Sequence, residues 1–78
     1  MVSNDVQVAV IGSRVVVRGP SGVPGELTIV ASSREEGLFR LSPRMPLASA
    51  LLGHQAGEEI EVRTAAATVK YSILSVLQ

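Results

Sequence analysis

The chain has 78 residues, seven basic and seven acidic side chains, and no cysteine. This length fits one domain with a small core, which buries only about 60% of the surface of the unfolded chain. The balanced charge provides no bulk field to draw the protein onto nucleic acid or an anionic membrane. Disulfides are excluded, and a single histidine, His54, leaves few ligands for a closed zinc site. We therefore expect no metal, no cofactor and no direct nucleic-acid partner.

The chain shows no targeting signal. No apolar run approaches the roughly 20 residues that span a bilayer, and residues 1–5 lack the basic and apolar regions of a signal peptide. The absence of cysteine is consistent with a reducing compartment. We expect a cytoplasmic protein without a membrane partner.

The first half of the chain alternates between strand and turn patterns. Valines at every second position of residues 6–10 predict a half-buried strand. Residues 14–18 and 26–31 form a predicted hairpin, whose long tip over residues 19–25 is rich in glycine and proline. Residues 38–41 predict a short strand, which Pro43 ends or confines to a sheet edge.

One helix is predicted, over residues 46–52. Pro46 suits the first helical position, and Gly53 suits the left-handed conformation that ends a helix. About two helical turns are too few to be stable alone in water, so the helix must pack against the strands.

Two more strands follow, over residues 59–63 and 68–77, with a turn at residues 65–67. The apolar alternation in the last strand slips after Ile73, which indicates a bulge there. Six strands and one helix predict an α+β fold, a twisted antiparallel sheet packed on the helix. The residues expected in the core are Val15, Val17, Leu27, Ile29, Leu51, Ile60, Val62, Tyr71 and Ile73.

No residue pattern indicates catalysis. Glu59 and Glu61 share one strand face, but Arg63 and Lys70 nearby favour an ordinary solvated surface. His54 follows the helix and has no second histidine, cysteine or aspartate at a useful spacing. The glycines of residues 19–25 lack the Gly-Lys-Ser/Thr ending of a phosphate loop. We expect a protein that is not an enzyme.

One stretch carries a family resemblance. Residues 41–53, Leu-Ser-Pro-Arg-Met-Pro-Leu-Ala-Ser-Ala-Leu-Leu-Gly, continue through His-Gln-Ala-Gly-Glu-Glu-Ile-Glu-Val to residue 62. This pattern resembles the C-terminal domain of the Gre transcript-cleavage factors of bacteria. Weaker similarity extends upstream to about Val10 and downstream through residues 71–76. We therefore divide the chain into residues 1–9, a short N-terminal segment or first strand, and residues 10–78, the Gre-like domain.

The resemblance implies a fold like that of the FK506-binding proteins and a docking role. In Gre factors this domain binds a coiled coil of RNA polymerase at the rim of the secondary channel. A separate N-terminal coiled coil with an acidic tip reaches the active site and holds a metal. Nine residues before Val10 cannot form such a hairpin of long helices. We expect a monomeric elongation regulator that has the docking half alone and competes with Gre factors.

The resemblance also points to a contact surface. Arg44, Met45, Pro46 and Leu47 align with the family's docking segment, and we expect them to form the centre of the polymerase contact. The family has serine where this chain has Met45, so the usual capping oxygen is absent. Pro43 replaces an apolar strand residue, and alanines replace a Pro-Gly-Gly turn at residues 65–67.

Two other functions remain open at this point. One is a docking module for a different protein, as in the nucleoside-diphosphate-kinase regulators that share this domain. The other is a peptidyl-prolyl isomerase, which the implied fold suggests but which needs several aromatic residues around a proline pocket. Phe39 and Tyr71 are the only aromatic residues of the chain, so the isomerase is the weaker alternative.

Overall fold

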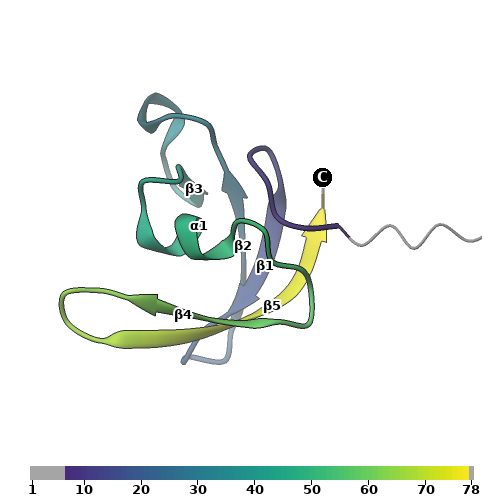
Figure 1. Ribbon diagram of the computed structural model, residues 1–78, viewed down its shortest axis with the longest axis vertical. Helices are drawn as coiled ribbons and strands as arrows, with labels where there is room; N and C mark the ends of the chain where they lie inside the picture. Colours follow the sequence, from purple (N-terminus) through teal and green to yellow (C-terminus); the bar gives the residue numbers. More distant parts are fainter. Residues whose placement is uncertain (1–6, 78) are drawn as a thin grey trace, which may run out of the picture.

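The computed structural model describes residues 7–77 as a five-stranded sheet packed against one short helix (Figure 1). The elements are β1 (Arg14–Arg18), β2 (Pro24–Ile29), the 3-10 turn η1 (Ser33–Glu35), β3 (Arg40–Leu41), α1 (Pro46–Leu51), β4 (Glu59–Arg63) and β5 (Thr68–Leu77). Along the sheet the strands run in the order β3-β2-β1-β5-β4. The α+β class predicted from the sequence is confirmed.

The sheet is mixed rather than wholly antiparallel. β1 pairs antiparallel with β2 and β5, and β4 pairs antiparallel with β5. β3 runs parallel to β2, with Thr28 opposite Arg40 and Ile29 opposite Leu41. A parallel neighbour cannot follow directly through a tight turn, and residues 30–39 loop back so that β3 begins opposite Thr28, near the end of β2.

The strand expected over residues 6–10 is not present as a strand. Val6 lies outside the described residues, and Val8 forms only an isolated bridge with Gln55. The alternation is also inverted, because Ala9 is fully buried while Val8 and Val10 are exposed. Ala9 donates its N–H to the carbonyl of His54 and accepts the N–H of Gly53. The segment therefore pairs with the residues that follow the helix, and the Ala9 side chain faces the core.

The bulge predicted near Ile73 is confirmed in β5. The register between β1 and β5 shifts between Val16 and Val17, which lie opposite Ser75 and Ile73. The extra residue is Leu74, which is exposed, so that both Ile73 and Val76 can face the core.

The core lies between the sheet and the helix. Of the nine residues expected there, eight are buried and Tyr71 is half-buried. Ala9, Ala48 and Val76 complete the buried apolar set. Full burial of one of the larger aliphatic side chains contributes about 1.5–3 kcal/mol, so this aliphatic core is the main source of stability.

The helix begins and ends close to the predicted residues. Pro46 occupies its first turn, and Met45 precedes it without any side-chain capping bond, as the sequence predicted. Gly53 has a φ of 84°, the left-handed conformation expected of the residue that ends the helix. Ala48 and Leu51 are fully buried, and the helix contacts β4.

Candidate docking surface at the start of the helix

The residues predicted to contact a partner lie together where the chain enters the helix. We call residues 44–47 the helix entry. Arg44 and Pro46 are exposed, whereas Met45 and Leu47 are half-buried. Leu47 packs against the core. Met45 therefore presents only part of its side chain to a partner.

The backbone of the helix entry is held by two hydrogen bonds. The N–H of Met45 donates to the carbonyl of Ser42 at 2.9 Å. The carbonyl of Met45 accepts the N–H of Ser49 at 2.9 Å, which closes the first helical turn. The ring of Pro46 fixes its own φ. These constraints place Met45 at a defined angle to the sheet although it lacks a capping oxygen.

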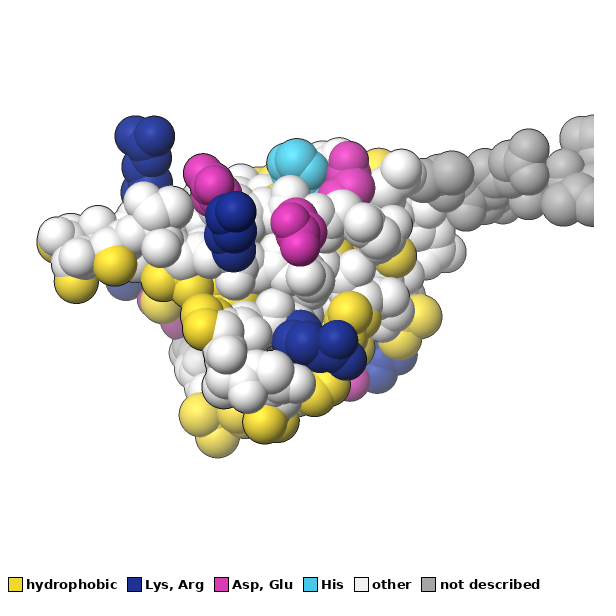
Figure 2. Space-filling model, turned by 90° about the horizontal axis from the view of Figure 1, so that it is seen from below, with side chains coloured by type: hydrophobic (Ala, Val, Ile, Leu, Met, Phe, Trp, Pro, Cys, Tyr) yellow, Lys and Arg dark blue, Asp and Glu magenta, His cyan; other side chains and the backbone are white. Residues whose placement is uncertain are grey.

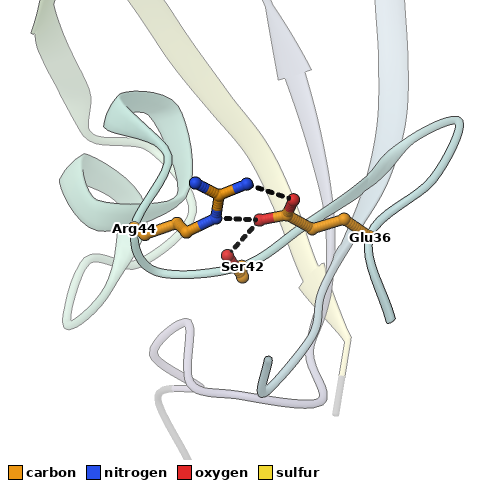
Figure 3. A network of polar contacts seen from close by, with 3 residues as sticks. All are labelled: Glu36, Ser42 and Arg44. Carbon is orange, nitrogen blue, oxygen red and sulfur yellow. Dashed lines mark hydrogen bonds and ion pairs between the residues drawn. The ribbon is translucent and has the colours of Figure 1, made fainter. Parts of the chain in front are cut away.

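A polar network joins the helix entry to the loop before β3 (Figure 3). The guanidinium of Arg44 donates from Nε to Oε2 of Glu36 at 3.1 Å and from Nη2 to Oε1 at 3.0 Å. The hydroxyl of Ser42 donates to Oε2 of the same carboxylate. The Arg44 side chain keeps 71% of its surface exposed, whereas that of Glu36 keeps 17%. Glu36 therefore acts as an anchor, and Arg44 remains available to a partner.

The same contacts perturb both charges. The hydrogen bond from Arg44, followed by that from Ser42, holds the pKa of the Glu36 carboxyl below its ordinary value. The hydrogen bond to Glu36 raises the pKa of Arg44. Both groups are therefore charged at neutral pH.

The sequence did not predict a second exposed feature beside the helix entry. We call residues 37–40 the apolar turn. Leu38 and Phe39 are 84% and 63% exposed, and the predicted strand over residues 38–41 is present only as Arg40–Leu41. Gly37 and Arg40 exchange both backbone hydrogen bonds, at 3.1 and 3.0 Å, so the two apolar side chains form the tip of a tight turn. A glycine directly before two large apolar residues was the only sequence signal for it.

The other charged candidates lie on an ordinary solvated surface. Glu59 and Glu61 are exposed, and Glu61 lies opposite Lys70 in the ladder between β4 and β5. Nδ1 of His54 lies 3.2 Å from Oε1 of Glu58, which is four residues further along the chain. Figure 2 shows acidic and basic side chains interspersed on one face of the molecule. Within residues 7–77, no three histidine, aspartate or glutamate side chains group as metal ligands would.

The two aromatic residues do not converge. The backbone carbonyl of Phe39 accepts the N–H of Thr28, which lies opposite Arg14 at the start of β1. Tyr71 packs beside Gly19, just beyond the end of β1, where a β-carbon on the glycine would lie 2.8 Å from Cε2 of the ring. An aromatic proline pocket of the kind that an isomerase uses therefore receives no support from this arrangement. In the same described part of the chain, no helix has the length and apolar character needed to cross a membrane.

Comparison with known proteins identifies the family. The sequence model of one protein family, the C-terminal domain of the transcription elongation factors GreA and GreB, matches residues 4–78. A comparison with curated proteins gave no match.

Solved structures support the same assignment. Gfh1 from Thermus aquaticus superposes with a TM-score of 0.80 at 21% identity, over 97% of this chain and 52% of its own. Gfh1 from Thermus thermophilus superposes with a TM-score of 0.77 at 23% identity, over 100% of this chain and 53% of its own. A GreA/GreB elongation factor from Nitrosomonas europaea has 28% identity and a TM-score of 0.71, over 91% of this chain and 61% of its own.

The chain thus spans between half and two thirds of the length of these proteins. The family match covers nearly every residue, and the fold agrees with it from β1 to β5. The chain belongs to the GreA/GreB family of transcription elongation factors and corresponds to their C-terminal domain.

Proposed function

We propose that this domain docks on bacterial RNA polymerase, at the coiled coil on the rim of the secondary channel, and regulates elongation. The observation that carries the proposal is the family match over residues 4–78, which includes the whole helix entry. We further propose that Arg44, Met45, Pro46 and Leu47 form the centre of the contact and that the domain acts as a monomer in the cytoplasm.

The chemistry of the helix entry suits such a contact. Arg44 offers an exposed guanidinium that is already oriented by Glu36, so little side-chain entropy is lost when a carboxylate of the partner binds it. Met45 offers a flexible, polarisable side chain that adapts to an imperfect apolar surface. Arginine and methionine are both enriched in protein interfaces.

The consequence for transcription follows from what the described residues contain. The helix that the structure describes in residues 7–77 is α1, which is too short to form a coiled coil that reaches into the polymerase. A polypeptide of these 78 residues would therefore occupy the docking site without supplying an acidic tip to the active site. We propose that it competes with Gre factors and does not stimulate transcript cleavage.

A Met45→Asp variant tests this proposal. The substitution places a charge at the centre of the proposed contact, and we expect binding to RNA polymerase to weaken about tenfold or more. Wild-type domain should reduce the cleavage that a Gre factor stimulates in stalled elongation complexes, and the variant should not. Neither protein should accelerate cleavage when added alone.

Val23→Asp is the matched control, because Val23 is 70% exposed at the β1–β2 hairpin and receives the same change. It should bind and compete like wild type. The thermal midpoints of both variants should stay close to that of wild type. Unchanged binding by Met45→Asp, or unfolding of that variant, would contradict the assignment of this surface, and accelerated cleavage would contradict the competitor role.

A further inference from the structure

The apolar turn is built in an unfavourable backbone conformation. Phe39 has a φ of 60°, and it is the one non-glycine residue between 7 and 77 with a positive φ. A turn that puts its third residue in the left-handed region favours glycine or asparagine, because a β-carbon there crowds the following carbonyl. A large aromatic residue is therefore a costly choice at this position.

Packing within the domain does not offset that cost. The Phe39 side chain is 63% exposed, and Leu38 beside it is 84% exposed. A polar residue at either position would fold at least as well and would remove an apolar tip from water. The conformation is nevertheless enforced, because the carbonyl of Phe39 accepts the N–H of Thr28 at 2.8 Å. Strain held at an exposed apolar tip is typical of a recognition element.

The charge around the turn is positive. The Arg40 guanidinium folds back over Gly37, where a β-carbon would lie 3.7 Å from both Nε and Nη2, and no ion pair to Arg40 forms among the described residues. The neighbouring carboxylates are engaged within the loop itself. Glu35 accepts the N–H groups of Ala31 and Ser32, and Glu36 holds Arg44. The turn therefore presents two apolar side chains beside an uncompensated cation.

Residues on either side of the apolar turn and β3 are hydrogen-bonded to the helix entry or to each other. Glu36 directly precedes the turn and Ser42 directly follows β3, and both belong to the network that orients Arg44 (Figure 3). The carboxylate of Glu36 thus fixes the turn relative to the helix entry.

We propose that the apolar turn is a second contact with the polymerase, in addition to the helix entry. Leu38 and Phe39 insert into an apolar depression on a helical surface of the partner, and Arg40 binds a carboxylate at its rim. The inference rests on the proposed docking function and adds to it the partner's chemistry, an acidic helical surface with an apolar site. The apolar contact determines how long the complex lasts, and Arg40 contributes to the rate of association.

The decisive variant is Phe39→Asn, since asparagine tolerates a left-handed φ and removes the aromatic ring. We expect its thermal midpoint to equal or exceed that of wild type by a few degrees, while binding to purified bacterial RNA polymerase weakens about tenfold through faster dissociation. Stability and binding thus change in opposite senses, which loss of a structural residue would not produce. Arg40→Gln should slow association and make it less dependent on salt.

Val23→Asn, a like change at the β1–β2 hairpin, should leave binding unaltered. Leu38→Asn repeats the test at a residue without the left-handed φ, and it decides the matter if Phe39→Asn fails to fold. If both turn variants bind like wild type while Met45→Asp binds weakly, the inference is wrong and the docking proposal stands. If wild type does not bind polymerase, both fail. If wild type sediments as a dimer and Phe39→Asn sediments as a monomer, the turn contacts a second copy of this chain instead. That result would overturn the inference.

Discussion

Two regions of this domain are built on different principles. The part of the sheet formed by β1, β5 and β4 consists of antiparallel ladders with one bulge in β5, and alternate side chains of β1 and β4 face the core. The segment of residues 33–47 contains a 3-10 turn, a two-residue edge strand and a tight turn, joined by side-chain hydrogen bonds. The first region supplies six residues to the core, whereas the second exposes Leu38, Phe39 and Arg44. The six are Val15, Val17, Ile60, Val62, Ile73 and Val76. Most of the core and the proposed contact surface therefore lie in different parts of the molecule, so we expect that stability and binding can be changed separately.

The largest effect expected is in the ladder region. Ile73 is 1% exposed beside the bulge, and Ile73→Ala would leave a cavity that costs about 2–5 kcal/mol of the free energy of unfolding. A domain of this size has little stability beyond that, so urea unfolding should show a largely unfolded variant or a much lower midpoint. Leu74→Ala is the adjacent control. Leu74 is 38% exposed, so its truncation should cost far less of the free energy of unfolding. Similar midpoints for the two variants would contradict the bulge as the device that turns Ile73 inward.

An intermediate effect is expected from the network. Glu36→Gln removes the charge that orients Arg44, and we expect polymerase binding to weaken several-fold while the strands remain folded. Binding is best measured beside Glu61→Gln, which makes the same change on the exposed face of β4 and should bind like wild type. Equal binding by the two variants would show that Arg44 does not depend on Glu36 for its orientation.

Glu36→Gln also tests how the stability of the domain depends on pH. Because the folded state lowers the pKa of Glu36, the unfolded chain binds more protons than the folded one as the solution is acidified. The stabilisation is complete above the ordinary carboxyl pKa of 4.5 and is lost as pH falls through the lower pKa of the folded state. Glu36→Gln should therefore lose less stability on acidification than wild type. Glu58→Gln should act alike, since the N–H of Gln55, followed by His54, lowers the pKa of Glu58. The thermal midpoints of wild type and of both variants are measured as a function of pH. If the midpoints of both variants fall with pH as steeply as that of wild type, the prediction is wrong.

The smallest effect is expected at the β4–β5 turn. The hydroxyl of Thr64 accepts the N–H groups of Ala66 and Ala67 and donates to the carbonyl of Ala67. Thr64→Ala should cost about 0.5–1.5 kcal/mol of stability, at the low end because the turn is exposed, with polymerase binding unaltered. Thr64→Ser retains the hydroxyl and should recover most of the loss. A binding defect in Thr64→Ala would place recognition outside residues 33–47.

The ladder region was largely predictable from the sequence. The alternation of Ile60 and Val62 in β4, and the slip after Ile73 in β5, reflect which side chains can face the core in a given strand. These patterns are local, so they can be read along the chain. The helix was predictable for the same reason, because Pro46 and Gly53 act through their own backbone preferences.

The segment of residues 33–47, which carries the proposed contacts, was predictable only in part. The family pattern indicated the helix entry, but not the half-burial of Met45 or the role of Glu36. Glu36 and Arg44 are eight residues apart and outside any regular element, so no period relates them. The apolar turn was mistaken for strand, since Leu38 and Phe39 favour strands and nothing nearby marks a left-handed residue.

The α+β class, the buried faces of β1 and β4, the start of the helix and the family could be predicted from the chain, because each depends on local periodicity, on proline and glycine, or on an ordered motif. The parallel placement of β3, the inward position of Ala9 and the left-handed φ of Phe39 could not be predicted in this way. All three depend on backbone hydrogen bonds to distant segments, such as those from Thr28 to Phe39 and from Gly53 to Ala9. Long-range pairing overrides local preference there, because an unpaired buried backbone group costs more than a strained dihedral angle or an exposed valine.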